Sequence, residues 1–572
     1  MKTKWGENLD KNNILNEYPR PQMERDSYLN LNGTWQYAIT ETEELPERFD
    51  GDILVPFSPE CELSGVMRSL LPTQTLWYQR TLHLPPDFNV GRVLLHFGAV
   101  DQVATVYLNG TEVCSHTGGY TPFSADITAY LKEENTILIK VRDFSDTTYH
   151  SRGKQKNKRG GIWYTAQSGI WQTVWVESVP KDYINALRIT PLFDESAVEL
   201  TVVSHSAQLC YAKVGETEVS FLPNKPVKLP MPQFIAWTPE CPHLYDLTVT
   251  MGNDHIKSYF GMRKFSVNTD DNGAKRLFLN NQPYFHNGLL DQGYYSDGMY
   301  TAPSDEAMIF DIQTAKDMGF NMLRKHIKIE PLRWYYHCDR IGMLVWQDMI
   351  NGGGKYRTIT ISSPLITGIH FKDDHYKWFA RNNEEGRRQY CLELDEMIHH
   401  LYNVVAIAMW VPFNEGWGQF DAGKAVQQIL KLDTTRTVDH ASGWHDQKIG
   451  NIKSLHVYFK KYRFKPDRLG RAVVLSEFGG YNYRVKGHCF NEKDFGYKRF
   501  DTAEELLKAY RDLYENEVQP AEKQGLCATV YTQLTDVEDE LNGLISYDRK
   551  VIKLPVEKVR EINEKMATLS RP

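Results

Sequence analysis

Two glutamates in the second half of the chain each follow an apolar run that ends in polar residues. Glu415 comes directly after the run VVAIAMWVPFN, and Glu477 ends the run AVVLSE. A single glutamate at a strand end is most often a salt-bridged rim residue. A pair at the ends of two facing strands has the make-up that glycosidic bond cleavage needs. That reaction uses one carboxylic acid to protonate the leaving oxygen and one carboxylate to attack the anomeric carbon, about 5 Å apart when configuration is retained.

Other polar and aromatic side chains stand at neighbouring strand ends, where they would surround a sugar. Asn414 could donate a hydrogen bond to a sugar hydroxyl, and Tyr458 could donate to Glu477 and keep it ionised. Trp410 and Trp444 could form walls for a sugar ring, because flat aromatic faces complement apolar C–H faces. The predicted substrate-binding set is Asp291, Arg324, His326, Asp348, Trp410, Asn414, Trp444, His456, Tyr458 and Gln533.

The element pattern from residue 268 onward explains how these side chains would meet. Eight apolar runs alternate there with helical patterns, at 284–291, 321–326, 343–349, 404–411, 436–442, 454–458, 472–478 and 528–534. Eight such repeats in about 300 residues predict a (β/α)8 barrel, whose active site lies at the carboxyl ends of the strands. Strands four and seven, which carry the two glutamates, would face each other. The loop 350–378 is long, and little helix follows strand five.

The chain before the barrel is expected to fold as two β-domains. Residues 1–180 show short β-branched runs between turn signals, including a hairpin signal at Asn109-Gly110, and predict a jelly-roll sandwich. Residues 181–267 contain about seven short strand patterns, which favours an immunoglobulin-like sandwich. The basic loop 151–163 is either a solvated connection or a loop leaning over the active site of the neighbouring domain. Residues 268–572 form the predicted barrel domain.

Composition excludes several classes of function. The net charge of −7 argues against a nucleic-acid partner. The eight cysteines form no C-x-x-C pair, and no Cys/His cluster has zinc spacing, so we expect neither a metal nor a cofactor. The first residues lack the apolar stretch of a signal peptide, and no run approaches a membrane span. We therefore expect a cytoplasmic protein with no membrane partner, unless a signal was removed; homo-oligomerisation stays open.

The motifs together resemble glycoside hydrolase family 2, the β-galactosidase and β-glucuronidase family. WVPFNEGWG (410–418) and VVLSEFGG (473–480) look like its acid/base and nucleophile signatures, and VDQVATVYLNG resembles its sugar-binding domain. DMGFNMLRKHIKIEP is similar to its second barrel strand. The resemblance covers essentially the whole chain. It implies a retaining exo-β-glycosidase acting on a terminal β-linked sugar of a glycoside, with Glu415 as acid/base and Glu477 as nucleophile.

Departures from the family pattern bear on which sugar is bound. The glucuronidases of the family carry Asn-x-Lys near the end of the barrel to bind the sugar carboxylate, whereas DVEDELNGLISYDRK (536–550) has no such pair. A β-galactoside is therefore the first choice. A β-glucuronide or β-galacturonide, a β-galactofuranoside and an arabinoside remain alternatives, because Arg484 and Lys486 follow the nucleophile and could bind a carboxylate by another geometry. The rival of a different class is a non-catalytic carbohydrate-binding protein.

Overall fold

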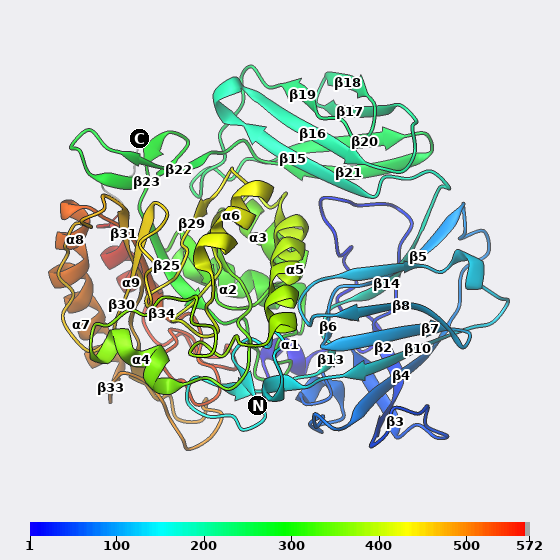
Figure 1. Cartoon of the computed structure of the whole chain (residues 1–572), viewed down its shortest axis with the longest axis horizontal. Helices are drawn as coiled ribbons and strands as arrows, with labels where there is room; N and C mark the ends of the chain where they lie inside the picture. The colour runs from blue at the N-terminus through cyan, green and yellow to red at the C-terminus, as the bar shows by residue number, and fades with distance from the viewer. Residues whose placement is uncertain (567–572) are drawn as a thin grey trace.

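The structure, a computed structural model, describes residues 1–566 of the chain. Two β-sandwiches and a helix-covered barrel follow one another along the sequence (Figure 1). The predicted order of jelly roll, immunoglobulin-like sandwich and barrel is confirmed. The first predicted boundary falls between β14 and β15, and the second falls inside β22 (Phe265–Thr269). The last six residues of the predicted barrel domain lie outside the described part.

The first sandwich packs two antiparallel sheets face to face. One has the order β1-β14-β5-β9 and the other β3-β2-β4-β10-β7-β8. Alternate residues of β7 and β10 are buried, as expected for strands with one face on the core. Asn109 (φ 52°) and Gly110 (φ 81°) form the predicted hairpin turn between β7 and β8. The strands are β1 (Leu29–Asn30), β2 (Gly33–Thr40), β3 (Gly51–Val55), β4 (Thr75–Leu82), β5 (Arg92–Phe97), β7 (Val103–Leu108), β8 (Thr111–Thr117), β9 (Phe123–Asp126), β10 (Asn135–Arg142) and β14 (Val174–Val179).

The second sandwich has seven strands, the number that the pattern predicted. Its sheets have the orders β15-β16-β19 and β18-β17-β20-β21. A small sheet of β22, β23 (Lys275–Leu279) and β24 (Gln282–Pro283) then leads into the barrel. The seven strands are β15 (Ala186–Leu192), β16 (Ala197–Val203), β17 (Cys210–Val214), β18 (Thr217–Phe221), β19 (Val227–Pro230), β20 (Tyr245–Met251) and β21 (Asp254–Phe260).

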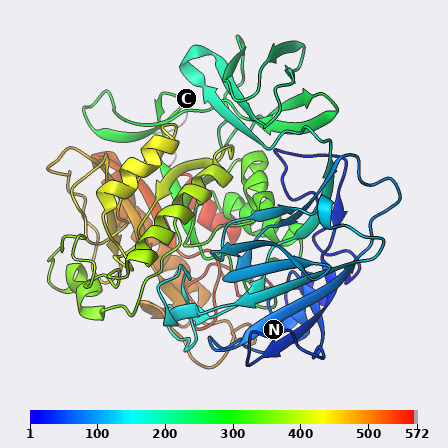
Figure 2. The same cartoon turned by 45° about the vertical axis from the view of Figure 1, so that its right-hand side comes forward.

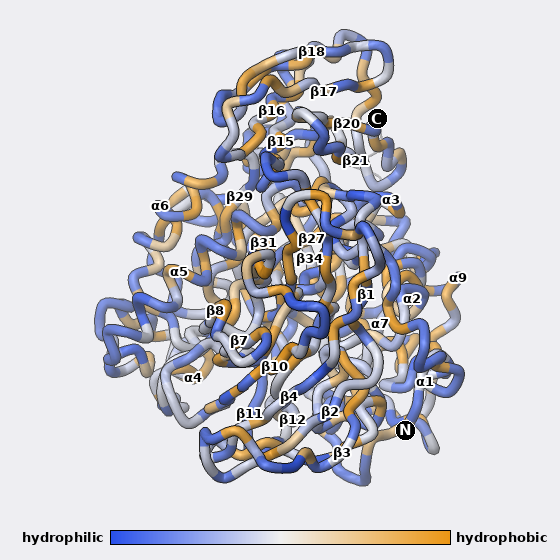
Figure 3. Tube along the Cα trace, turned by 90° about the vertical axis from the view of Figure 1, so that its right-hand side faces the viewer, coloured by the Kyte–Doolittle hydropathy of each residue, from blue (hydrophilic) through white to orange (hydrophobic). Residues whose placement is uncertain are grey.

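Eight parallel strands form the barrel, in the order β29-β28-β27-β26-β25-β34-β31-β30. All eight predicted strand regions are present. Every residue of β27, β31 and β34 is buried, because helices cover the outside and side chains fill the inside, and the hydrophobic colour follows β27 and β34 in Figure 3. The strands are β25 (His286–Asp291), β26 (Met322–Lys325), β27 (Leu344–Asp348), β28 (Ile407–Val411), β29 (Thr437–Val438), β30 (Ile452–Val457), β31 (Ala472–Gly479) and β34 (Leu526–Thr532).

Helices surround most of the barrel, as predicted. The structure places no α-helix between β29 and β30, in agreement with the weak pattern after strand five. The loop 350–378 is not wholly irregular, because it contains α4. The helices are α2 (Asp305–Asp317), α3 (Leu332–Ile341), α4 (Thr358–Ile366), α5 (Glu384–Leu401), α6 (Ala422–Leu432), α7 (Ala503–Leu513), α8 (Gln519–Gln524) and α9 (Val556–Asn563).

The first sandwich lies directly against the barrel, and the turned view in Figure 2 shows its loops reaching across to the barrel strands. Backbone bonds join the loop 151–163 to the barrel, because the N–H of Arg152 donates to the carbonyl of Asn351 at 3.0 Å. All eight cysteines are unpaired. Over residues 1–566, we find no helix with the length and apolar character needed to cross a membrane.

Candidate active site

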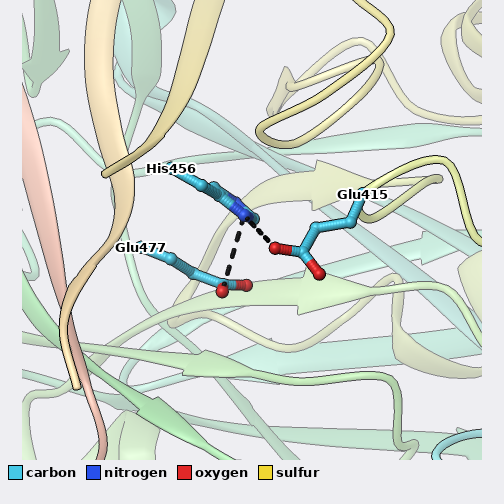
Figure 4. A group of neighbouring side chains, drawn as sticks. All are labelled: Glu415, His456 and Glu477. Carbon is cyan, nitrogen blue, oxygen red and sulfur yellow. Dashed lines mark hydrogen bonds and ion pairs between the residues drawn. The ribbon is translucent and has the colours of Figure 1, made fainter. Parts of the chain in front are cut away.

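The two predicted catalytic glutamates lie on opposite barrel strands and point toward one another (Figure 4). Glu415 sits in the turn after β28, with a positive φ of 51°, and its backbone N–H donates to the carbonyl of Ser442 at 2.9 Å. Glu477 lies within β31. One oxygen of each carboxylate and a ring nitrogen of His456 all lie within 4.8 Å of one another. This spacing fits a retaining pair and is too short for an inverting one.

Both oxygens of Glu477 accept hydrogen bonds from fixed donors. Arg324 Nη1 donates to Oε1 at 3.1 Å, and the Tyr458 hydroxyl donates to Oε2 at 2.6 Å. Burial and the neighbouring Glu477 hold the pKa of Tyr458 well above its usual range, so the phenol stays a donor. The bond expected between Tyr458 and Glu477 is thus present, and together with the Arg324 bond it fixes the orientation of the carboxylate.

Arg324 connects Glu477 with Asp348 and Asn414. Its guanidinium forms a bidentate pair with Asp348, at 3.0 Å for both bonds, and Nη2 donates to Asn414 Oδ1 at 2.9 Å. Burial opposes the charge, but Asp348 and Glu477 outweigh it and raise the pKa of Arg324. A fully buried, permanently charged group of this kind fixes its partners' geometry before any substrate arrives.

Glu415 is held from both sides. His456 Nδ1 lies 2.8 Å from Oε1, and Trp417 Nε1 donates to Oε2 at 3.2 Å. Burial raises the pKa of Glu415, but these two partners more than offset it, so the pKa is lowered overall. His456 Nδ1 also lies 3.5 Å from Glu477 Oε2, and the ring therefore stands between the two carboxylates.

A narrow cavity opens onto both glutamates. Loop 151–163 of the first sandwich supplies part of its wall, so the second of the two interpretations of that loop is the observed one. The lining residues are Lys154, Ile162, Trp163, Leu290, Gln292, His326, Ile327, Asn351, Asn414, Glu415, Trp417, Tyr458, Glu477, Tyr497, Thr532 and Glu540.

Three aromatic rings from three separate segments meet beside Glu415. The ring of Trp163 lies 5.0 Å from that of Trp417, in an edge-to-face arrangement, and 5.8 Å from that of Tyr356. Tyr356 in turn lies 5.1 Å from Trp417. Because Trp417 donates to Glu415, this cluster joins the sandwich loop and the loop 350–378 to that glutamate.

The structure brings some predicted binding residues into the pocket and keeps others behind it. His326, Asn414 and Tyr458 line the cavity with the two glutamates. His456 contacts both carboxylates, and Arg324 donates to Glu477 while it is itself paired with Asp348. Asp348 also lies 2.7 Å from His326 Nδ1.

Besides Arg324, Asp348 and His456, four further predicted binding residues lie outside the pocket lining. The prediction that Trp410 forms a sugar wall is wrong: its indole is fully buried and donates to Asp433 at 2.9 Å. Asp291 pairs with Lys325 at 2.7 Å, since strand alternation turns Lys325 away from Arg324. Trp444 packs beside His456, and Gln533 accepts a bond from the pocket residue Gln292.

Several lining residues were missed by the sequence-based prediction. Trp417 stands two positions after Glu415 in a motif that was recognised, so its proximity could have been inferred. Lys154 belongs to the basic loop whose position was left open. Glu540 lies in the segment 536–550, which enters the prediction only through its lack of an Asn-x-Lys pair, and nothing local marks Tyr497. Arg484, by contrast, bonds to the carbonyl of Asn491 and does not line the pocket.

Glu415, His456 and Glu477 are also the group of described residues whose ligand atoms lie close enough to hold one metal ion. An ion there would engage both carboxylates and would oppose rather than support their use as acid and nucleophile.

Comparison with known proteins defines the family. Sequence profiles of glycosyl hydrolases family 2 match residues 66–180 (sugar-binding domain), 181–263 and 273–521 (TIM barrel domain). The chain belongs to glycosyl hydrolases family 2.

Relatives and solved structures carry different sugar names. A putative β-glucuronidase of Formosa agariphila is 29% identical over 358 residues, covering 56% of this chain and 41% of that protein. A β-galactosidase of Thermoanaerobacter pseudethanolicus is 25% identical over 450 residues, covering 72% and 55%. The chain thus spans about half the length of these curated relatives. The fold is similar to a β-D-glucuronidase of Dictyoglomus thermophilum, with a TM-score of 0.74, 16% identity and coverage of 96% and 98%. It is also similar to a family 2 β-galacturonidase of Eisenbergiella tayi, with a TM-score of 0.70, 18% identity and coverage of 96% and 99%.

Proposed function

We propose that this protein is a retaining exo-β-glycosidase that removes a terminal β-linked sugar by double displacement. The observation that carries the proposal is the facing pair of Glu415 and Glu477, with carboxylate oxygens within 4.8 Å. Family membership supports the same reaction class. A non-catalytic sugar-binding protein would have no need for a fixed, doubly hydrogen-bonded carboxylate at the end of β31.

In the first step, Glu415 gives its proton to the glycosidic oxygen while Glu477 attacks the anomeric carbon. The carbon–oxygen bond to the leaving group breaks, and a glycosyl ester forms on Glu477. Arg324 and Tyr458 hold the Glu477 carboxylate in position until it attacks. Asn414, itself oriented by Arg324, is placed to donate to the 2-hydroxyl of the sugar.

In the second step, Glu415 is a carboxylate and removes a proton from water. The water oxygen then attacks the anomeric carbon, and the ester to Glu477 breaks. The contacts from His456 and Trp417 favour the ionised form of Glu415, which suits this base role. In the first step the same contacts make Glu415 a stronger acid, provided that the working pH keeps it protonated.

We propose a neutral β-galactoside as the preferred substrate. The carboxylate-binding Asn-x-Lys pair is absent from 536–550, and the cavity instead presents Glu540 beside the two catalytic glutamates. Three carboxylates disfavour an anionic sugar and supply acceptors for hydroxyl groups.

A second candidate is a β-uronide, either a glucuronide or a galacturonide. It is favoured by one observation: Lys154 lines the cavity, and an ammonium could pair with the carboxylate of the sugar.

A panel of nitrophenyl β-glycosides tests the proposal and separates the two candidates. We expect turnover of the β-galactoside with kcat/KM at least about tenfold above that of the β-glucuronide and β-galacturonide, the discrimination that one charge-assisted contact provides. NMR of the first-formed sugar should show the β anomer. Formation of the α anomer, or turnover unaffected by Glu477→Ala, would exclude the double-displacement assignment.

A further inference from the structure

The loop 151–163 places one ammonium group in the catalytic cavity. Of the described residues that line this cavity, Lys154 is the only lysine or arginine. Its side chain is 12% exposed, and the nearest carboxylate oxygen is Glu540 Oε2 at 3.9 Å. That distance is too long for a hydrogen bond, and Nζ makes none with any residue of 1–566. A nearly buried cation with unused donors is costly unless a ligand completes it.

The backbone around Lys154 holds the ammonium in place. Its carbonyl accepts from the N–H of Tyr164 at 2.8 Å, beside the short pairing of β11 (Gln155–Lys156) with β12 (Tyr164–Thr165). The ammonium lies 5.2 Å from the centre of the Tyr164 ring. Arg152, two residues earlier, bonds to the carbonyls of Gly353 and Gly354 and so anchors the loop on the barrel.

Glu540 approaches the same point from the barrel. Its side chain is 3% exposed, and one oxygen accepts from the Tyr164 hydroxyl. Tyr164 therefore contacts both members of the pair. Lys154 reaches the cavity from the sandwich, and Glu540 reaches it from the loop after β34. Tyr164 lies beside the gap between their charged atoms.

We propose that Lys154 and Glu540 together bind one hydroxyl group of the terminal sugar, and that this pair determines the preference for a neutral sugar. The inference rests on the proposed glycosidase function. One oxygen atom can lie about 2.8 Å from both charged groups when these are 3.9 Å apart. A hydroxyl at that point accepts from the ammonium and donates to the carboxylate, so it satisfies both.

A sugar carboxylate cannot do the same. It accepts from Lys154, but it has no proton for Glu540, and the two anions would stand within a few ångströms of each other. Binding of a uronide would therefore require Glu540 to take up a proton.

The surroundings of Glu540 make that protonation pH-dependent. The titratable groups that face it are Lys154 and Tyr164 from the sandwich loop, Glu477 from β31, and Tyr497 next to β33 (Lys498–Phe500). Burial raises the pKa of Glu540, Lys154 opposes this and Glu477 adds to it. As the pH falls through this raised pKa, Glu540 becomes a donor, so activity on uronides relative to galactosides should rise toward acid pH.

Two substitutions in the full-length chain test the pair. Glu540→Gln keeps the acceptor for Tyr164 and adds a donor in place of the negative charge. We expect it to raise the ratio of kcat/KM for β-galacturonide over β-galactoside by about tenfold or more, and to abolish the pH dependence of that ratio. Lys154→Met should lower kcat/KM for the β-galactoside by about 10- to 100-fold.

The matched control is Lys156→Met, because Lys156 lies two residues further along the same loop, in β11, with its ammonium over the Trp163 ring, 4.2 Å from the centre. It should leave the ratio unchanged. Circular dichroism and the melting temperature check that each variant is folded.

The possible outcomes are distinct. A wild-type preference for the uronide that Lys154→Met removes selectively would make Lys154 a carboxylate clamp and overturn the proposal. An unchanged ratio in Glu540→Gln would overturn it as well. Absence of turnover of any β-glycoside by wild type would instead refute the glycosidase function itself.

Discussion

Replacement of Glu415 by alanine is the sharpest test of the catalytic roles. In the structure, one carboxylate oxygen of Glu415 contacts His456 Nδ1, and the other accepts a hydrogen bond from Trp417 Nε1. Removing the side chain leaves these two nitrogens facing an empty space beside the anomeric carbon, while Glu477 keeps its bonds from Arg324 and Tyr458. The nucleophile should therefore stay competent, and only proton transfer should be lost.

The size of the effect depends on the leaving group. General acid catalysis contributes about 10²- to 10⁴-fold, or about 2.7 to 5.4 kcal/mol of barrier. A methyl or disaccharide glycoside, whose leaving oxygen must be protonated, should lose this full amount. A 2,4-dinitrophenyl glycoside needs no proton to leave and should lose little in its glycosylation step.

Azide provides the decisive assay. A small anion can enter the space left in Glu415→Ala and attack the glycosyl-enzyme, so the product should be the β-glycosyl azide. Glu477→Ala should give the α anomer, because azide then replaces the nucleophile. Glu415→Gln, which fills the same space without an acidic proton, is the control and should respond weakly to azide. The opposite anomers would exchange the two roles, and equal losses for both leaving groups would refute the assignment of Glu415 as acid.

Three further predictions follow from the same contacts. Tyr458→Phe removes the 2.6 Å donor to Glu477 and should lower kcat/KM by about tenfold or more for every leaving group; a loss confined to poor leaving groups would contradict this. His456→Asn removes the main partner that lowers the pKa of Glu415. The pKa should rise, Glu415 should stay protonated to higher pH, and the alkaline limb of kcat/KM should move upward; a downward shift would contradict the contact. A chain beginning at Gly273 loses Lys154 and the sandwich surface that covers the barrel, so it should be poorly soluble and nearly inactive. Full activity of this fragment would show that the sandwiches are only appended.

Local sequence was sufficient to predict the barrel and the facing pair of glutamates. The strand that carries Glu477, β31, is buried on both faces and therefore appears in the sequence as a continuous apolar run. The alternation of such runs with helical patterns is visible without any long-range information. Since parallel strands of a barrel present their carboxyl ends on one face, the polar residues that follow them could be grouped in advance. That logic correctly joined Arg324, Asn414, Tyr458 and the two glutamates.

The same logic failed where the role of a residue depends on the direction of its side chain or on a loop that is distant in the sequence. Trp410 stands near the end of β28, but its indole points to the helix side and bonds to Asp433. Asp291 was expected to bind sugar, yet it neutralises a buried lysine. Alternation along a strand gives two faces, and only the packing of the surrounding helices decides which polar groups those faces must satisfy.

By itself, the sequence determined the order of the domains, the eight strands and the pair of Glu415 and Glu477, because each depends on short periodic patterns. Only the tertiary structure decided that loop 151–163 closes the pocket, that Lys154 meets Glu540, and that Trp163 packs on Trp417. The residues of these pairs are hundreds of positions apart, and no local pattern encodes where one domain docks on another. The physical reason is that docking follows from the combined surface of both domains, whereas strand formation follows from a few neighbouring side chains.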